Sequence, residues 1–412
     1  MSVIDQLYER SRWEAFLQYK QEQGHLSLRD EADLARFIAE EEYIGTLDRI
    51  RKSGFSVPAK RFINKVDNGK KRVVYIFGRE ENYVLKLMTF LLIRKYDAIF
   101  AANLFSFRSC QGVRRAVEFL KRMPGLDTKY VYKSDISDYF NSIDVSRLLP
   151  ILEKVMADDM ETFGIIARLL SDDRVVLPDG SLSREKKGIM AGVPLASFLA
   201  NVYLKDMDWH FRNLRIPYAR YSDDIILFAS TAQEREQGIR YIHDFLQEAR
   251  LEMNAAKECF TEPFQKWTFL GISYEKGVFD VSEISARKLK MKMRRKSRAL
   301  LRWKAKKHLG NDKAARAFVK AFNRKLYDND ARSELTWARW FFPIINTADT
   351  LEQIDHYMQD CIRYIASGKR NGARYRFRYE DMKRLGYRSL VHEYYAVKKN
   401  PEEGKEVRPG GA

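Results

Sequence analysis

Two adjacent aspartates, Asp223 and Asp224, lie between two short apolar runs at 216–220 and 225–229. The second run is rich in residues that favour β-strands, and Pro217 in the first run is compatible with the start of a strand. The stretch therefore predicts a β-hairpin with two carboxylates at its tip. Carboxylates on a rigid base suit a divalent cation, although an Asp-Asp pair at such a tip is more often an ordinary solvated turn.

A third carboxylate, Asp135, follows an alternating stretch at 130–134 that predicts a strand ending in this residue. An aspartate at the end of a strand can project into a crevice and hold a ligand. Aspartate is also a preferred N-cap, so Asp135 could instead cap the helix predicted after it. The residues alone leave both interpretations open.

Two further segments carry residue types suited to phosphates. The run 187–204 is a glycine-bearing loop that leads into an apolar helix. Gly188 and Gly192 allow a backbone to approach a ligand closely, although glycines also serve ordinary turns. Residues 59–77 predict a β-hairpin with an Asn-Gly turn and a basic tip at 70–72. Such a tip can grip phosphate oxygens, but it is commonly only a solubilising turn.

The composition indicates a globular protein with a polyanionic partner. The 412 residues are 45% hydrophobic, which is enough to bury a sizeable core in two or three folded units. Lys and Arg total 74 against 56 Asp and Glu, so the net charge is +18. The stretch from Arg287 to Lys325 alone holds 17 Lys or Arg and one acid, Asp312. Nucleic acid is the expected partner, with an anionic membrane surface as the competing one.

Other features exclude several classes of protein. Cys110, Cys259 and Cys361 are far apart and odd in number, so they indicate neither a disulfide framework nor a zinc site. The first residues lack the basic and apolar regions of a signal peptide, and no apolar run approaches the ~18 residues that span a bilayer. We therefore expect a soluble, cytoplasmic protein that does not act at a membrane.

Helical segments are expected at both ends of the chain. Residues 1–50 carry apolar side chains at helical spacing, and we interpret them as a packing segment. Residues 284–400 are predicted to be helical and basic. The interleaved arginines and tyrosines at 374–379 suit stacking on bases, although a surface strand would alternate in the same way. Residues 401–412 are predicted to be disordered.

Taken in order, these segments resemble motifs A to E of the reverse transcriptase palm. The five matching features are the strand ending in Asp135, the glycine loop, the hairpin Tyr221-Ser222-Asp223-Asp224, the loop at Lys257, and the run Phe269-Leu270-Gly271. The basic hairpin and the segment 103–108 resemble the fingers motifs that precede them in that family. The resemblance extends from about residue 59 to residue 280.

The resemblance implies an α+β right-hand polymerase fold. After the N-terminal helical segment, the fingers would occupy 51–134, and a palm built on an RRM-like antiparallel sheet would occupy 104–283, interleaved with the fingers. Motifs A to E would lie at 131–274. A helical, basic thumb and C-terminal RNA-binding region would follow at 284–400.

The implied activity is that of an RNA-directed DNA polymerase, which is a nucleotidyltransferase. By resemblance, Asp135, Asp223 and Asp224 hold two magnesium ions, which manganese can replace. In-line phosphoryl transfer depends on positioning and on neutralising the attacking and leaving oxygens, and two ions roughly 3.5–4 Å apart do both. The implied partners are an RNA template, deoxynucleotides and the cDNA product, while the oligomeric state stays open.

The same resemblance assigns further residues. Nucleotide-binding residues would be Lys71, Arg72, Asp138, Phe140 and Gly192, with Phe140 as the gate that excludes a ribose 2′-hydroxyl. Lys257 would protonate the departing pyrophosphate. Primer-binding residues would be Tyr221, Ser222, Phe269, Leu270 and Gly271. RNA-binding residues would be Arg294, Arg295, Lys296, Arg298, Arg302 and Lys304.

One departure from the family pattern lies in motif B. Met190 and Ala191 precede Gly192, where the family usually has Pro-Gln, so a side chain that could contact template or nucleotide is missing. With this altered motif and the basic helical C-terminal region, the chain looks most like the bacterial defence-associated reverse transcriptases of the abortive-infection and unknown-group branch, which are related to retron and group II intron enzymes. That similarity implies copying of a dedicated structured non-coding RNA in antiphage defence.

Three alternatives compete with this interpretation. They are a retron-like or intron-derived enzyme, an enzyme of untemplated or protein-primed DNA synthesis, and a non-catalytic RNA-binding scaffold with a degenerate polymerase fold. The intact Asp135, Asp223 and Asp224 argue against the scaffold, because acids clustered in a basic protein are costly without a metal.

Overall fold

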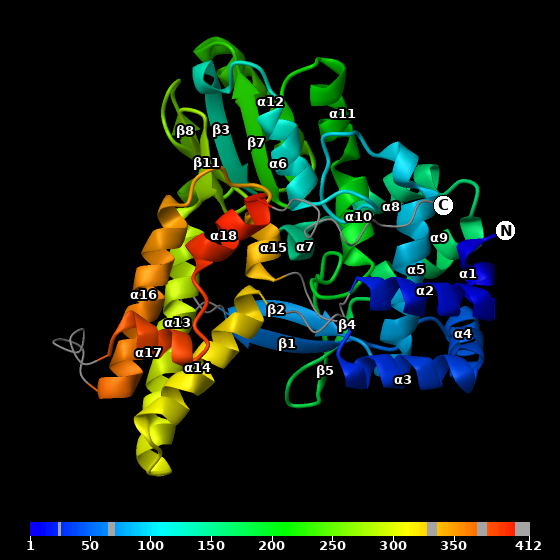
Figure 1. Cartoon of the computed structure of the whole chain (residues 1–412). Coiled ribbons are helices and arrows are strands. Elements are labelled where there is room, and N and C mark those ends of the chain that lie inside the picture. Colours follow the sequence, from blue (N-terminus) through cyan, green and yellow to red (C-terminus); the bar gives the residue numbers. More distant parts are fainter. Residues whose placement is uncertain (24–25, 65–70, 328–335, 369–376, 400–412) are drawn as a thin grey trace. The chain divides into compact units, whose positions relative to one another are not determined.

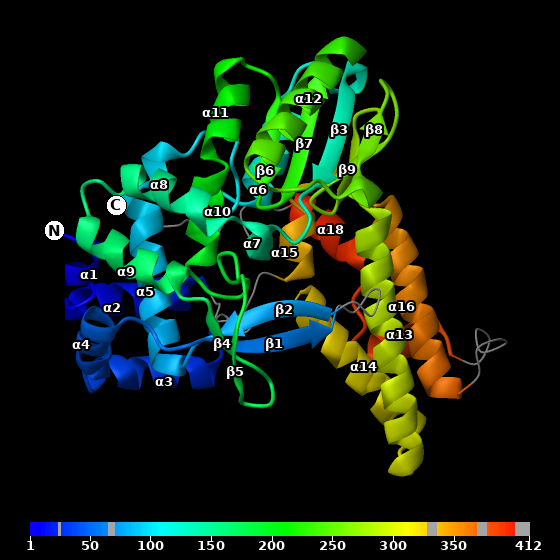
Figure 2. The same cartoon turned by 180° about the vertical axis from the view of Figure 1, so that it is seen from behind.

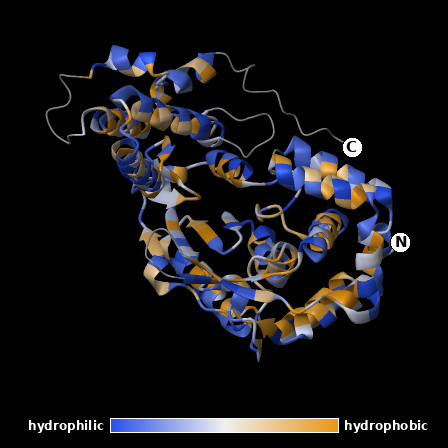
Figure 3. Cartoon of the chain, turned by 90° about the horizontal axis from the view of Figure 1, so that it is seen from below, coloured by the Kyte–Doolittle hydropathy of each residue, from blue (hydrophilic) through white to orange (hydrophobic). Residues whose placement is uncertain are grey.

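The computed structural model describes residues 1–23, 26–64, 71–327, 336–368 and 377–399 (Figure 1). The chain divides into two compact units, Met1–Pro263 and Phe264–Ala412. Helices and sheets are mixed, which confirms the expected α+β class. Figure 3 shows hydrophobic and hydrophilic residues interspersed along the same helices, so that a helix can bury one side and expose the other. Among the described helices, none is both long and apolar enough to cross a bilayer.

The first unit contains a four-stranded antiparallel sheet, here called the central sheet. Its strand order is β6-β7-β3-β8. The strands are β3 (Tyr130–Asp135), β6 (Tyr218–Tyr221), β7 (Asp224–Ala229) and β8 (Cys259–Thr261). Residues 225–228 of β7 are fully buried, and α12 (Ala232–Glu248) lies against β7 and β3 in both views (Figures 1 and 2). Burial of this apolar strand gives the hairpin at its end a rigid base.

A second sheet of the first unit has the strand order β2-β1-β4-β5. Its strands are β1 (Ala59–Asn64), β2 (Lys71–Ile76), β4 (Arg174–Val176) and β5 (Leu182–Arg184). Strands β1 and β2 pair antiparallel over their whole length, which is the pairing that the sequence predicted for 59–77. The predicted Asn-Gly turn itself lies outside the described residues.

The first unit has further helices, and all of them except α6 contribute residues to one hydrophobic core with the central sheet. They are α1 (Val3–Gln6), α2 (Arg10–Glu22), α3 (Leu28–Ala39), α4 (Glu42–Ser53), α5 (Arg79–Lys95), α6 (Val113–Lys121), α7 (Tyr139–Ser142), α8 (Val145–Val155), α9 (Met160–Ser171), α10 (Ala196–Tyr203) and α11 (Lys205–Asn213). Trp13 of α2 is completely buried, and its indole nitrogen donates to the Leu7 carbonyl at 2.7 Å. The N-terminal helices are therefore an integral part of this core.

The second unit combines a small sheet with long helices. Strands β9 (Trp267–Phe269), β10 (Ile272–Glu275) and β11 (Val278–Val281) form a three-stranded antiparallel sheet. The helices are α13 (Glu283–Lys306), α14 (Asn311–Leu326), α15 (Trp337–Phe341), α16 (Asp349–Ser367), α17 (Tyr379–Arg384) and α18 (Leu390–Lys399). Helices α13, α14 and α16 pack against one another. Tyr379 begins α17, whereas residues 374–376 and the predicted tail 401–412 lie outside the described part of the chain.

Candidate active site

Three aspartates meet at one end of the central sheet. Asp135 is the last residue of β3 and lies directly opposite Asp224, the first residue of β7. Asp223 occupies the two-residue turn between β6 and β7, and its carbonyl accepts a hydrogen bond from the Ile136 amide at 3.2 Å. The N-cap of α7 is Asp138, so the interpretation of Asp135 as the cap of that helix is wrong. The three carboxylates thus come from two neighbouring strands and their turn.

Charge at this end of the sheet is poorly compensated by the protein. The Asp135 side chain is buried, and its Oδ1 has no hydrogen-bond partner in the described residues. Its Oδ2 pairs with the Lys257 ammonium. Burial raises the pKa of Asp223 and of Asp224, and repulsion from the neighbouring carboxylates raises both further. Asp223 and Asp224 can therefore be ionised only at a cost, unless more positive charge is supplied.

This donor set fits a hard divalent cation. It consists of carboxylate oxygens only, one of them buried without a partner, and magnesium prefers such ligands. Part of the positive charge now comes from Lys257 and from Lys133, whose Nζ lies 4.0 Å from Asp224 Oδ1. Nowhere in the described residues do three or more His, Cys, Asp or Glu side chains form a closed metal site. A cation shared by these aspartates would therefore have to displace the Lys257 ammonium from Asp135.

A buried ion pair that the sequence analysis missed supports the hairpin. Arg220 of β6 and Asp208 of α11 are fully buried, and the guanidinium donates to both carboxylate oxygens, at 2.8 and 2.5 Å. Burial lowers the pKa of Arg220, but the Asp208 carboxylate outweighs this and raises it above its usual value. Burial also raises the pKa of Asp208, and the two short hydrogen bonds from the guanidinium oppose that rise. Arg220 also donates from Nη1 to the Ser222 carbonyl at 3.1 Å. The only sequence signal was an arginine inside an otherwise apolar strand.

The turn residue Ser222 is held from the other side by the segment 103–106. Leu104 forms a parallel bridge with Arg220. The Ser222 amide donates to Ser106 Oγ at 2.8 Å, and Asn201 donates to the Ser106 carbonyl at 2.8 Å. Ser222 has a φ of 60° and is 6% exposed. Its position is therefore specified by internal hydrogen bonds, and its side chain has little surface to offer a primer.

A cavity of about 590 Å³ in the first unit gathers several of the predicted nucleotide-binding residues. Arg72, Phe140 and Gly192 line it, together with Tyr221 and Phe107. The Phe107 ring lies 6.4 Å from the Phe140 ring and 6.4 Å from the Tyr221 ring, measured between centroids. The cavity thus has aromatic walls, a glycine and a cation, a combination that suits the base and the phosphates of a nucleotide.

Two predicted nucleotide-binding residues do not line this cavity. Lys71 is exposed, and its ammonium lies 6.0 Å from the centre of the Phe62 ring. Asp138 is exposed at the start of α7, and its Oδ1 accepts a hydrogen bond from Asn141 Nδ2 at 3.1 Å. Their part in nucleotide binding stays a prediction.

The glycine loop rests directly on the segment that carries Phe140. A Cβ atom added at Gly188 would lie 2.4 Å from the Phe140 carbonyl oxygen, and the same oxygen accepts from the Ile189 amide at 2.9 Å. The Ala191 amide donates to Asn141 Oδ1 at 3.1 Å. Ala191 is 1% exposed, so the residue that replaces the usual glutamine faces the protein interior. The loop positions Phe140 through backbone contacts.

A cluster of cations at the same cavity was not expected from the sequence. Lys20 of α2 and Lys86 and Arg94 of α5 line the cavity, and no ion pair links them to an acid among the described residues. Burial lowers the pKa of all three, and repulsion from the other two lowers that of Lys20 further. Arg94 also lies 3.4 Å from the centre of the Phe90 ring. The interpretation of the N-terminal helices as mere packing is therefore incomplete, because α2 contributes positive charge to the cavity.

The predicted primer-binding run forms a tight turn of the second unit. Leu270 and Gly271 join β9 to β10, and both have a positive φ, 49° and 84°. The Gly271 carbonyl accepts from the Ser282 amide at 2.9 Å. The Phe269 ring is 1% exposed and belongs to the interior of the unit. Only the turn itself remains accessible, so primer contacts by these residues stay a prediction for the Leu270 side chain and the backbone.

The predicted RNA-binding cations lie on α13. Five are exposed, namely Arg294, Arg295, Lys296, Arg298 and Arg302. Lys304 is half-buried, and its Nζ donates to the carbonyls of Ile365 and Ala366, at 3.1 and 3.4 Å. These carbonyls belong to the last turn of α16. Lys304 thus caps a helix, which leaves it less able than the others to contact RNA.

The comparison with protein families shows the family to which the chain belongs. The family described as "Reverse transcriptase (RNA-dependent DNA polymerase)" matches residues 63–274, which is more than half of the 412 residues. The chain belongs to the reverse transcriptase family. The matched segment of this reverse transcriptase includes the three aspartates, the glycine loop and Lys257, and the family assigns it to the RNA-directed DNA polymerases.

Solved telomerase structures are similar to this reverse transcriptase. Telomerase from Candida tropicalis in complex with a TWJ fragment of telomeric RNA is 13% identical, with a TM-score of 0.47, over 90% of this chain and 67% of that chain. Telomerase from Candida albicans with a TWJ fragment is 11% identical, with a TM-score of 0.44, over 88% and 70%. Apo telomerase from Candida tropicalis, truncated from its C-terminal domain, is 12% identical, with a TM-score of 0.43, and 55% of each chain is covered. The present chain therefore spans about half the length of that truncated telomerase chain. The search of curated protein sequences found no match to the present chain.

Proposed function

We propose that this reverse transcriptase copies RNA into DNA with two magnesium ions bound by Asp135, Asp223 and Asp224. The observation that carries the proposal is the convergence of these carboxylates from β3, β7 and the turn, with Asp135 Oδ1 buried and without a partner in the described residues. When bound, the ions neutralise the attacking and leaving oxygens of an in-line phosphoryl transfer. Manganese accepts similar oxygen ligands and is expected to replace magnesium.

The protein's own side chains bind and orient the nucleotide. Arg72, at the cavity wall, is proposed to bind phosphate oxygens, since guanidinium matches their geometry. Phe140, on the same wall, is proposed to exclude a ribose 2′-hydroxyl and so select deoxynucleotides. The Lys257 side chain is 61% exposed. Its ammonium can therefore leave Asp135 and is proposed to donate a proton to an oxygen of the departing pyrophosphate.

We further propose that the template is a dedicated structured non-coding RNA and that the enzyme serves antiphage defence. Two features support this assignment. Ala191 in motif B departs from the usual family pattern, and the exposed cations of α13 suit the binding of a large RNA. Purification of the protein from cells that carry its native flanking DNA, followed by sequencing of the bound RNA and DNA, tests it. One enriched RNA with complementary cDNA is expected, whereas unrelated RNA and DNA would refute a dedicated template. A cytoplasmic location stays a prediction.

The metal assignment has its own experiment. Asp223→Ala with Asp224→Ala should abolish DNA synthesis on a primed RNA template and leave RNA binding near normal, because the change is confined to the end of the central sheet. Asp244→Ala, which alters an exposed aspartate of α12, is the matched control and should retain synthesis. Synthesis by the double variant would refute the assignment of these residues as metal ligands.

A further inference from the structure

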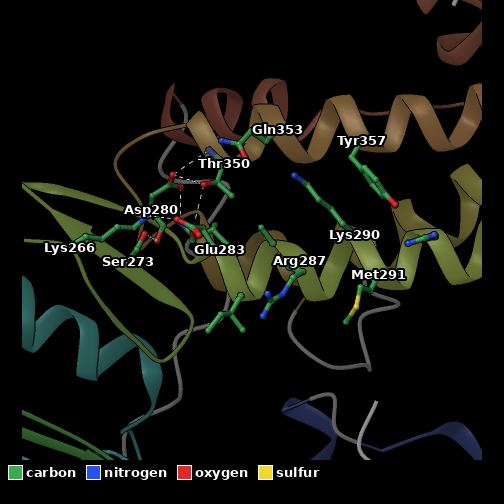
Figure 4. A pocket seen from close by; sticks show the side chains of 14 residues that line it. Lys266, Ser273, Asp280, Glu283, Arg287, Lys290, Met291, Thr350, Gln353 and Tyr357 are labelled. Carbon is green, nitrogen blue, oxygen red and sulfur yellow. Dashed lines mark hydrogen bonds and ion pairs between the residues drawn. The ribbon is translucent and has the colours of Figure 1, made fainter. Parts of the chain in front are cut away.

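A groove runs between α13 and α16 within the second unit (Figure 4). It consists of two adjoining cavities of about 570 and 240 Å³. Arg294 and Tyr357 line both cavities, so the groove continues from one into the other. Arg294 and Arg298 are among the predicted RNA-binding cations, whereas the side chains of α16 that line the groove have no role assigned above.

One wall of the groove is a row of four cations on α13, here called the cation stripe. It consists of Arg287, Lys290, Arg294 and Arg298. The spacings of three, four and four residues place these side chains on the same face of the helix. At 1.5 Å per residue, the stripe is about 16 Å long. This length can accommodate the backbone of a few successive nucleotides.

The acids that line the groove are already occupied by other partners. Asp280 accepts from Thr350 Oγ1 at 2.6 Å, which Figure 4 marks with a dashed line. Glu283 pairs with Lys266 at 2.8 Å. Asp360 pairs at 3.1 Å with an arginine three residues further along α16. In the part of the chain that the structure describes, no ion pair joins the cation stripe to an acid. The groove lining as a whole has five Lys or Arg side chains against three acids, so it carries a net positive charge of +2.

The opposite wall carries two tyrosines on α16. Tyr357 and Tyr364 are half-buried and seven residues apart, which places them on one face of the helix, two turns apart. The Lys290 ammonium lies 5.9 Å from the centre of the Tyr357 ring. In Figure 4, Lys290 and Tyr357 extend from their two helices into the space between them. Aromatic rings thus face the cation stripe across the groove.

We propose that this groove binds an unpaired polynucleotide strand, with phosphates on the cation stripe and bases stacked on Tyr357 and Tyr364. A row of cations facing aromatic rings is the arrangement by which proteins hold single strands. A duplex keeps its bases stacked inside and cannot offer their faces to these rings. The proposal rests on the proposed RNA-directed synthesis, in which both the template and the new strand have unpaired segments. It places the binding site of such a segment in the groove between α13 and α16.

The test uses the full-length protein and labelled oligonucleotides of equal length. The probes are single-stranded oligouridylate, single-stranded oligothymidylate and an RNA–DNA hybrid duplex. Tyr357→Ala with Tyr364→Ala should weaken binding of the single strands by about fivefold or more, the lower end of the effect for a stacked base, while the corresponding phenylalanine pair stays within about twofold. Arg294→Gln with Arg298→Gln should reduce the slope of log affinity against log salt by roughly 0.7 for each phosphate that the variant no longer neutralises.

The control removes two charges outside the groove. Lys306→Gln with Lys307→Gln alters exposed lysines at the end of α13, and it should reduce single-strand affinity less than the arginine pair does. Thermal unfolding checks that each variant is folded. If the alanine pair does not fold, two other variants still test the proposal. The phenylalanine pair preserves the aromatic rings, and the arginine pair changes only exposed side chains.

Each outcome then decides for or against the groove. Loss of single-strand binding with duplex binding retained supports it, and the relative loss for oligouridylate and oligothymidylate shows whether an RNA or a DNA strand occupies it. Three results would overturn the proposal. They are an equal loss of duplex binding, an equal loss of single-strand binding in the phenylalanine pair, and binding of an acidic peptide to the groove in preference to the oligonucleotides. Asp223→Ala with Asp224→Ala should keep single-strand binding, so failure at the active site and failure at the groove give different results.

Discussion

The ion pair between Arg220 and Asp208 allows a direct test of how the aspartate hairpin is held in place. Both side chains are fully buried, and the guanidinium contacts both carboxylate oxygens. Arg220→Met fills a similar volume but leaves the Asp208 carboxylate buried without its counter-charge. Removal of one partner of a buried pair costs about 3–5 kcal/mol, so we expect the free energy of unfolding of the first unit to fall by this amount.

A second variant replaces all the polar partners of this ion pair with apolar residues, and so distinguishes the effect of the buried charge from the effect of side-chain packing. Asp208→Leu with Arg220→Met removes the uncompensated charge, and apolar replacement of a buried pair is often neutral or stabilising. The Tyr218 hydroxyl donates to Asp208 Oδ1 at 3.2 Å. Tyr218→Phe is therefore added, because an orphaned buried hydroxyl costs about 1–3 kcal/mol. The triple variant should recover most of the stability but not DNA synthesis, since it no longer has the Arg220 hydrogen bond to the Ser222 carbonyl at 3.1 Å.

Urea denaturation followed by tryptophan fluorescence, together with DNA synthesis on a primed RNA template, measures both effects. Arg212→Met, which changes an exposed arginine of α11, is the matched control and should alter the free energy of unfolding by less than about 0.5 kcal/mol. A decrease below about 1 kcal/mol for Arg220→Met would mean that the pair behaves as an exposed one. Normal synthesis by the triple variant would refute the role of Arg220 in holding the turn.

Three other predictions concern the cavity wall, the glycine loop and the thiols. Phe140→Ala should admit ribonucleotides in primer extension, because it removes a ring that lines the cavity; unchanged sugar discrimination would remove Phe140 from the gate. Gly188→Ala should lower the free energy of unfolding by more than the ~1–2 kcal/mol of a left-handed residue, because its Cβ would lie 2.4 Å from the Phe140 carbonyl oxygen. A smaller decrease in thermal unfolding would mean that the loop relaxes. Thiol titration at mildly alkaline pH should label the exposed Cys110 and Cys259 quickly and Cys361 only after unfolding, because burial raises the pKa of Cys361 to about 11 and so suppresses its thiolate. Equally fast labelling of all three would contradict the burial of Cys361.

Local sequence was sufficient for much of the fold that carries the site. The hairpin around Asp223 and Asp224, the strand ending in Asp135 and the pairing of β1 with β2 all followed from alternation and turn residues. Such signals lie within a few residues of one another, because a strand and a tight turn are specified by adjacent backbone conformations. The order of these segments also indicated the reverse transcriptase family, which the family comparison confirmed.

Only the tertiary structure decided which distant residues meet. Arg220 pairs with Asp208 across two elements, Lys257 reaches Asp135 from a loop 122 residues away, and Lys20 of α2 lines the cavity beside Phe140. Periodicity predicted the helix that became α13, but it did not show that α16 would place two tyrosines opposite its cations. The physical reason is that periodicity gives the face of an element and not its neighbour, which is chosen by packing over the whole unit.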